Sequence, residues 1–370
     1  MRQPTPIASP WLAVLLVAAV GAACGGPVES TAAASPQEPE PEEVKLAEGF
    51  TTFMALADTP LNSLPKAEAW RQEVPEVREV TITSTADGSE QPALFYDSGS
   101  DRDKPLLVVL HSWTADYRKQ FSIPYGVWAV NNDWVMIHPE YRGRFNRPEA
   151  TLSELAVQDV VDAYWWATEH AHIDEDRIYL TGFSGGAMAA LTMVGRYPEL
   201  WTAAAAWVPV YDLVDWYATI KEHTDLHYAR NIVASCGGKP VAGTEAEEEC
   251  RRRSPSSYLE NARHAGVEVL IATGVDDWFV PPRHALRAYN VLAEPEDRLT
   301  EAQIEAISAD ATIPDDFSGE FSNPLIEDAG KELLLAKESD DVVLWIFDGS
   351  HDVIYNAGLE WLSRQRGTGS

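Results

Sequence analysis

The stretch "RIYLTGFSGGAMAALTM", from Arg177 to Met193, decides the architecture that the sequence predicts. It begins with a short apolar run, which is typical of a strand buried in a sheet. Its second half is rich in Ala, Leu and Met, which favour a helix. Ser184 stands among glycines where the two patterns meet. The sequence therefore predicts a sharp strand-to-helix turn that presents a single hydroxyl group.

Strand-like runs recur on both sides of this turn. The predicted strands are residues 77–85, 92–98, 106–111, 134–138, 177–182, 203–210, 267–274 and 342–349. Asp87 and Gly88 form a hairpin signal between the first two. The later runs are continuously apolar, as parallel strands buried on both faces are, and helical patterns such as residues 151–170 lie between them. We expect an α/β domain with a mostly parallel eight-stranded sheet and helices on both faces.

This domain is expected to span residues 76–368, after a helical lead-in segment, residues 46–75, whose role the sequence leaves open. Two of its connections are long, residues 212–257 and 294–340. Thr300 and Gln303 in the second fit a capping box at a helix start. We expect both insertions to be cap-like and to lie over the C-terminal edge of the sheet, because long insertions there often carry function.

The first 24 residues have the layout of a secretory signal peptide: a basic start, an apolar run and small residues before Cys24. The ending "VGAAC" resembles a bacterial lipoprotein box, in which Cys24 becomes the lipidated first residue, although Gly21 stands where leucine is usual. Residues 25–45 are rich in Pro, Ala, Ser and Glu and are predicted to be a disordered linker. We expect an exported protein, anchored by a lipid to a bacterial membrane or cell envelope, or else secreted.

The net charge and the two remaining cysteines indicate which partners and which compartment to expect. The formal net charge is -30, so binding to a nucleic-acid backbone is not expected. Cys236 and Cys250 are 14 positions apart. A disulfide between them is expected in an oxidising compartment and would contribute about 3 kcal/mol by the loop-entropy estimate.

Residues 182–186, "GFSGG", fit the pattern G-x-S-x-G of a nucleophile elbow. A serine hydroxyl needs a base, and the base needs an orienting acid. In chain order, the elbow predicts an acid and then a histidine after Ser184. Asp276 and Asp277 follow one predicted strand, and His351 follows the last one. Active sites of open α/β sheets collect at these strand ends, so a catalytic triad is predicted there.

These motifs resemble the catalytic domain of the prolyl oligopeptidase family of α/β-hydrolases. The resemblance also runs through "PEYRG" (139–143), "YPELWTAAAAWVPVYDLVDWY" and "RSPSSY", and it covers most of residues 105–290. In that family the acid lies in a pattern G-x-x-D-x-x-V, which Gly274, Asp277 and Val280 match. The resemblance thus implies the α/β-hydrolase fold, the triad Ser184, His351 and Asp277, and an acyl-enzyme intermediate.

The loop that follows residues 106–110 departs from this family. Related hydrolases usually have His-Gly-Gly or His-Gly-x there, whereas this chain has His111, Ser112 and Trp113. An oxyanion hole needs two backbone N–H donors. Gly185, after the nucleophile, is expected to supply one, and Trp113, or alternatively Ser112, the other. His111 is expected to pack beneath the loop.

The substrate remains open at this point. Peptidases that resemble this domain usually carry a β-propeller, for which the residues before 76 leave no room. We therefore expect a small-molecule or short-peptide substrate. Three functions remain possible: a peptidase, a carboxylesterase acting on acylated sugars or aryl esters, and a catalytically silent surface binding protein. No cofactor and no metal are expected, and "HAHIDEDR" (170–177) is interpreted as a helix end and a loop. The tryptophans that could line an aromatic pocket, or else pack in the core, are Trp113, Trp207, Trp216 and Trp278.

Overall fold

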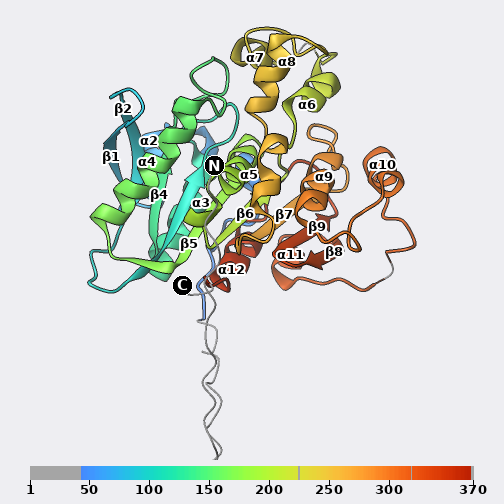
Figure 1. Cartoon of the computed structure of the whole chain (residues 1–370). Coiled ribbons are helices and arrows are strands. Elements are labelled where there is room, and N and C mark those ends of the chain that lie inside the picture. Colours follow the sequence, from blue (N-terminus) through green and yellow to red (C-terminus); the bar gives the residue numbers. More distant parts are fainter. Residues whose placement is uncertain (1–42, 224–225, 318, 368–370) are drawn as a thin grey trace, which may run out of the picture. The chain divides into compact units, whose positions relative to one another are not determined.

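A nine-stranded mixed sheet organises the part of the chain that the computed structural model describes, residues 43–223, 226–317 and 319–367 (Figure 1). The strand order is β1-β2-β4-β3-β5-β6-β7-β9-β8. The strands are β1 (Arg78–Thr83), β2 (Glu90–Tyr96), β3 (Lys104–Leu110), β4 (Val135–Pro139), β5 (Ile173–Phe183), β6 (Ala203–Trp207), β7 (Glu268–Gly274), β8 (Leu333–Ser339) and β9 (Val342–Phe347). The strands from β4 to β9 in this order pair in parallel, and β1, β2 and β8 join antiparallel at the two edges.

The predicted number of eight strands was wrong, because β8 lies inside the predicted insertion 294–340. This strand pairs with β9 alone and forms an edge of the sheet. Its second half carries Lys337 and Glu338, as exposed edge strands often do, and these charges obscure the strand pattern. Asp340 and Asp341, which join β8 to β9, were the hairpin signal that could have revealed it.

Helices cover both faces of the sheet. The α-helices are α1 (Phe53–Ala57), α2 (Lys66–Glu73), α3 (Ile123–Asn132), α4 (Glu154–His170), α5 (Gly185–Arg196), α6 (Leu213–Ile220), α7 (Tyr228–Ser235), α8 (Glu245–Arg252), α9 (Arg283–Leu292), α10 (Glu301–Asp310), α11 (Pro324–Asp328) and α12 (Tyr355–Ser363). Helices α4, α5 and α9 pack with Leu106 and Val108 of β3 in one core, whereas α2, α3 and α12 pack with Leu107 and Val109 in the other. Adjacent residues of a strand point to opposite faces, so β3 is buried on both.

The lead-in segment, residues 46–75, is part of this packed unit. Leu56 and Trp70 are buried in the second core. The indole of Trp70 donates a hydrogen bond of 2.9 Å to the carbonyl oxygen of Arg118. Thr52 pairs as an isolated bridge with Ile354, directly before α12. The segment therefore reaches the loop that carries His351.

The two insertions differ in their placement. The described residues of 212–257 include α6, α7 and α8, which lie together at one end of the packed unit that holds the sheet (Figure 1). A disulfide joins Cys236 at the end of α7 to Cys250 in α8. In the second insertion α10 carries the expected capping box between Thr300 and Gln303 and packs beside α9.

The predicted signal peptide, Cys24 and nearly all of the predicted linker lie outside the described residues. Among the helices that are described, none is long and apolar enough to cross a membrane.

Candidate active site

Ser184 lies at the turn between β5 and α5. Its backbone has φ 57° and ψ −115°, a conformation that residues other than glycine rarely adopt and that is common at functional sites. A Cβ atom on Gly182 would lie 2.2 Å from the backbone of Gly186, and one on Gly186 would lie 2.2 Å from the carbonyl oxygen of Leu110. The glycines of the motif are therefore required by close backbone approach, and the turn aims the serine hydroxyl at the sheet's C-terminal edge.

Three side chains from distant segments meet at this edge. The ring Nε2 of His351 lies 2.9 Å from the hydroxyl oxygen of Ser184, and its Nδ1 lies 2.7 Å from Oδ2 of Asp277. These residues follow the ends of β5, β7 and β9. Because a carboxylate can only accept, Nδ1 donates to Asp277 and Nε2 is left free to accept the serine proton. Such a chain can draw a proton from the hydroxyl as the oxygen attacks a carbonyl.

The two neighbouring aspartates have different surroundings. The side chain of Asp277 is fully buried, and its Oδ1 accepts the backbone N–H groups of Phe279 at 3.0 Å and Val280 at 2.9 Å. Asp276 is exposed and makes no side-chain hydrogen bond to the described residues. The carboxylate that faces the ring of His351 is therefore that of Asp277.

A further acid, Asp352, was not singled out by sequence reasoning. Its Oδ1 accepts the N–H groups of Met54 at 3.1 Å and Val353 at 2.9 Å. Burial raises the pKa of the Asp352 carboxyl above its ordinary value. These bonds turn Asp352 toward the lead-in segment, and it joins that segment to the loop of His351.

Two backbone N–H groups lie close together beside Ser184. A Cβ atom on Gly185 would lie only 2.7 Å from the backbone nitrogen of Trp113, so the two backbones nearly touch. Within the described residues, neither the N–H of Gly185 nor that of Trp113 has a hydrogen-bond acceptor. Free N–H groups in this position can receive a negatively charged oxygen. Of the two predicted donors in the loop, Trp113 is the one against Gly185, while Ser112 lines the adjoining cavity.

His111 lies beneath this loop. Its ring stacks on Tyr141 with 4.1 Å between centroids, and its Nε2 lies 2.8 Å from the carbonyl oxygen of Glu140. The hydroxyl of Tyr141 donates to the carbonyl oxygen of His111 at 2.6 Å. These contacts hold the backbone that leads into Trp113.

A cavity of about 120 Å³ opens beside Ser184. About half of its lining residues are phenylalanines and tyrosines: Phe53, Phe121, Tyr125, Phe183, Tyr228, Phe279 and Tyr355. Phe53 comes from α1 and Tyr228 from α7, so both the lead-in segment and the first insertion reach the site. No periodic pattern in the sequence connects either residue with Ser184, and sequence reasoning missed both.

A wider hollow of about 630 Å³ adjoins this cavity, and Phe53, Tyr228, Phe279 and His351 line both. Two exposed apolar side chains line it, Met54 at 54% and Trp278 at 58% relative exposure. Trp113, Trp207 and Trp216 are all buried in the hydrophobic cores. Of the four tryptophans considered for a pocket, Trp278 alone presents an open ring surface.

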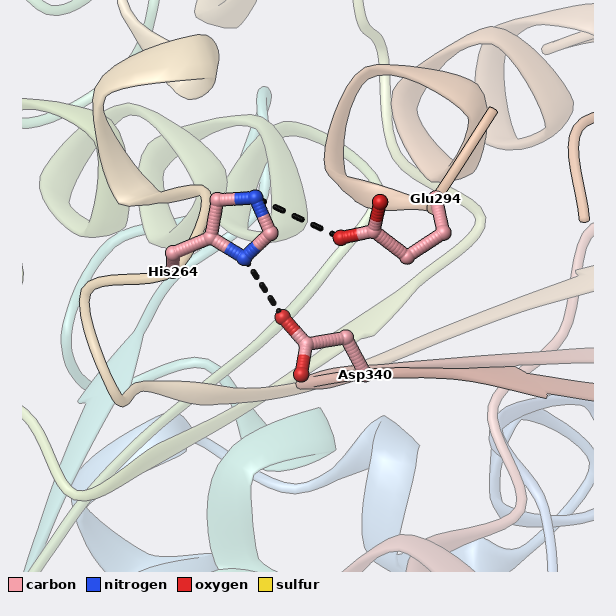
Figure 2. Close-up of side chains that lie close together, drawn as sticks. All are labelled: His264, Glu294 and Asp340. Atoms are coloured by element: carbon pink, nitrogen blue, oxygen red, sulfur yellow. Dashed lines mark hydrogen bonds and ion pairs between the residues drawn. The ribbon is translucent and has the colours of Figure 1, made fainter. Parts of the chain in front are cut away.

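One group of possible metal ligands occurs among the described residues, away from Ser184: His264, Glu294 and Asp340 (Figure 2). Nδ1 of His264 lies 2.8 Å from Asp340, and Nε2 lies 3.3 Å from Glu294. Each carboxylate thus occupies a different nitrogen of the same ring, and Arg263 also donates to Glu294 at 2.9 Å. An ion could take only one of these nitrogens, so the arrangement is that of an ion-pair network tying the segment before β7 to the β8–β9 turn.

The "HAHIDEDR" segment likewise forms no group of three possible metal ligands with the other described residues. β5 begins at Ile173, earlier than the predicted strand, so Asp174 lies in the strand and not in a loop. Asp174 forms an ion pair of 2.6 Å with Arg177.

The central parallel strands, the strand–Ser184–helix turn and the later positions of Asp277 and His351 are those of the α/β-hydrolase fold, and the predicted fold class is confirmed. Residues 131–308 match the model of the prolyl oligopeptidase family. The chain is therefore similar to this family over just under half of its length.

Individual relatives match parts of the chain. Acetylxylan esterase A of Emericella nidulans is 28% identical over 116 residues, 28% of this chain and 37% of the relative. The acylamino-acid-releasing enzyme of Mus musculus is 27% identical over 142 residues, 37% of this chain and 18% of the relative. The chain thus spans well under half of either protein. The structure of an acylaminoacyl peptidase of Pyrococcus horikoshii covers 74% of this chain and 37% of its own, at 16% identity and a TM-score of 0.47.

Proposed function

We propose that this protein is a serine hydrolase that cleaves ester or amide bonds, with Ser184 as nucleophile, His351 as general base and then general acid, and Asp277 as the orienting acid. The observation that carries the proposal is the continuous hydrogen-bonded chain from the Ser184 hydroxyl through the imidazole to a buried carboxylate. In the first step His351 takes the serine proton as the oxygen attacks the carbonyl carbon. The protonated ring then donates that proton to the leaving group, and an acyl-enzyme remains for water to hydrolyse.

The negative charge that develops on the carbonyl oxygen is held by the N–H groups of Gly185 and Trp113. Both are free of other acceptors among the described residues, so they are available without prior rearrangement. Gly185 is also the first residue of α5. The positive end of the helix dipole therefore adds to the stabilisation of this oxygen.

The substrate is proposed to be a small molecule or a short peptide. The matched relatives include one named as an esterase and one named as an acylamino-acid-releasing enzyme, so both ester and amide bonds are candidates. The first candidate activity is that of a prolyl-oligopeptidase-like peptidase. A carboxylesterase for acylated sugars or aryl esters is the second, and the exposed ring of Trp278 favours it, since sugars and aryl groups stack on such surfaces.

The test is hydrolysis of three substrate sets by the wild type and by Ser184→Ala: acyl-sugar esters, aryl esters and short aminoacyl amides. The variant should lose all turnover while its thermal unfolding stays that of a folded protein. Ser350→Ala is a matched control, because this hydroxyl lies next to His351 but outside the proton chain. Full activity in Ser184→Ala would contradict the proposal, and a wild type inactive on all three sets would favour the catalytically silent binding protein.

We also propose that the protein is exported and anchored through a lipid on Cys24. The support is the sequence alone, the basic start, apolar run and "VGAAC" ending. In a bacterial host, the wild type should partition into the detergent phase of Triton X-114 and incorporate labelled fatty acid, whereas Cys24→Ser should do neither. Equal behaviour of the two proteins would exclude the anchor.

A further inference from the structure

The aromatic cavity beside Ser184 contains one basic side chain that lacks a counter-charge, that of Lys119. This residue precedes the short helix η2 (Gln120–Ser122) and is half-buried. Its ammonium lies 4.6 Å from the centroid of the Phe121 ring. Within the described part of the chain, Lys119 Nζ has neither an ion-pair partner nor a hydrogen-bond acceptor. The residues that line the cavity include no aspartate and no glutamate.

The fully buried lysine of the described residues, Lys104, has a counter-charge. Lys104 is 1% exposed, and its ammonium lies 2.6 Å from Asp97. Lys66, close to Lys119, is paired with Asp116. A partly desolvated ammonium without a partner is unfavourable, and the chain has 58 acidic side chains that could have supplied one. The lack of a carboxylate partner at Lys119 therefore indicates that its ammonium group is available to an external anion.

The electrostatic surroundings of Lys119 agree with this view. Burial lowers the pKa of the Lys119 ammonium, and repulsion from Lys66 lowers it further; Asp116 opposes this, and Arg144 adds a smaller lowering effect. A cavity wall with this character attracts an anion locally, although the chain as a whole, at net charge -30, repels anions.

The position of Lys119 relative to the reaction decides which part of a substrate it meets. His351 lines both cavities, whereas Ser184 and Ser112 line only the cavity of Lys119. The leaving group receives its proton from His351 and can therefore extend into the wider hollow, which His351 also lines. The acyl part becomes bonded to Ser184 and is therefore assigned to the smaller aromatic cavity, which is the one of the two that Ser184 lines.

We propose that Lys119 is a specificity-determining residue that receives a negatively charged group, such as a carboxylate, at the far end of the substrate's acyl part. The inference rests on the proposed function and names the substrate class for it: short acyl groups with an apolar stem and an anionic end. Phe121 and Phe183 contact the stem, and the ammonium forms an ion pair with the end. Acyl groups that end in a cation find no carboxylate in the cavity and are disfavoured.

The experiment compares two esters of equal chain length, the mono-4-nitrophenyl ester of adipic acid and neutral 4-nitrophenyl hexanoate. The measured quantity is the ratio of kcat/KM for the anionic ester to that for the neutral one, with the Ser184→Ala rate subtracted as background. Lys119→Met should lower this ratio about tenfold or more, since a charged hydrogen bond contributes about 1.5–3 kcal/mol. Lys119→Arg should preserve it, and Lys119→Glu should lower it further.

Lys221→Met is the matched control, because Lys221 is an exposed lysine at the end of α6, outside the cavity lining. It changes the net charge equally and should leave the ratio unchanged. An unchanged ratio in Lys119→Met, with Ser184-dependent turnover of both esters, overturns the inference and leaves the proposed function intact.

A binding measurement keeps the inference testable if neither ester is hydrolysed. Both esters are titrated against Ser184→Ala and against the double variant Ser184→Ala/Lys119→Met by tryptophan fluorescence. Tighter binding of the adipate ester that disappears in the double variant supports the role of Lys119 even where turnover fails. Equal affinity for the two esters in Ser184→Ala overturns it.

Discussion

Replacing Asp277 by asparagine should impair catalysis through the position of one proton. Oδ1 of Asp277 accepts two backbone N–H groups, those of Phe279 and Val280, and Oδ2 faces Nδ1 of His351. The amide oxygen of an asparagine must keep the first position, because its NH2 group cannot accept those two donors. The NH2 group is then forced toward His351, whose Nδ1 must become an acceptor. The ring proton moves to Nε2, where it blocks transfer from Ser184.

The expected loss in kcat is about 10⁴-fold, as in serine proteases in which the same carboxylate is replaced, or about 5.5 kcal/mol in activation free energy. The assay is steady-state hydrolysis of a 4-nitrophenyl ester near neutral pH, with thermal unfolding to establish that the variant is folded. Asp276→Asn is the control, since Asp276 is exposed and touches no ring nitrogen. A folded Asp277→Asn protein within tenfold of the wild-type rate would refute the reasoning, as would a larger loss in Asp276→Asn.

Three predictions concern stability and are measured by urea unfolding. Gly186→Ala should lower the free energy of unfolding by about 3 kcal/mol, because the new Cβ would lie 2.2 Å from the carbonyl oxygen of Leu110. A loss below about 1 kcal/mol, on the order of an ordinary surface substitution, would contradict this prediction. The double substitution Cys236→Ser/Cys250→Ser should lower the free energy of unfolding by about 3 kcal/mol, and an unchanged midpoint of urea unfolding would contradict this. Burial lowers the pKa of His284 from 6.5 to about 4, so between these values the unfolded state binds a proton that the native state does not. The unfolding free energy should therefore fall with decreasing pH, by up to about 1.4 kcal/mol per unit, and His284→Asn should reduce that slope.

The sequence was informative where backbone geometry restricts the choice of residue. The glycines around Ser184 are required by contacts as short as 2.2 Å, so the motif carries structural information about the turn. Asp277 and His351 follow strand ends directly, and the strands themselves are apolar enough to be recognised. The structure brings together the three side chains that motif order had singled out. β8 was missed because an edge strand with charged residues resembles a loop.

The walls of the site could not be predicted in the same way. Phe53 and Tyr228 reach the cavity through tertiary packing of segments more than 40 residues from Ser184 in the chain, and no local pattern encodes that packing. Trp278 was suspected on its position after a strand, but the same reasoning selected Trp207 and Trp216, which are buried in the core. Lys119 was not noticed, because the absence of a counter-ion is visible only once the surroundings are known.

The most direct test of the account is to treat the intact protein with a fluorophosphonate and to locate the adduct by mass spectrometry. Only a serine whose hydroxyl is activated by a neighbouring base reacts quickly with such a reagent. The account predicts a single adduct on Ser184, absent in Ser184→Ala and strongly slowed in His351→Ala. Failure to label the folded wild type, or an adduct on another serine, would contradict the assignment of Ser184 as the nucleophile.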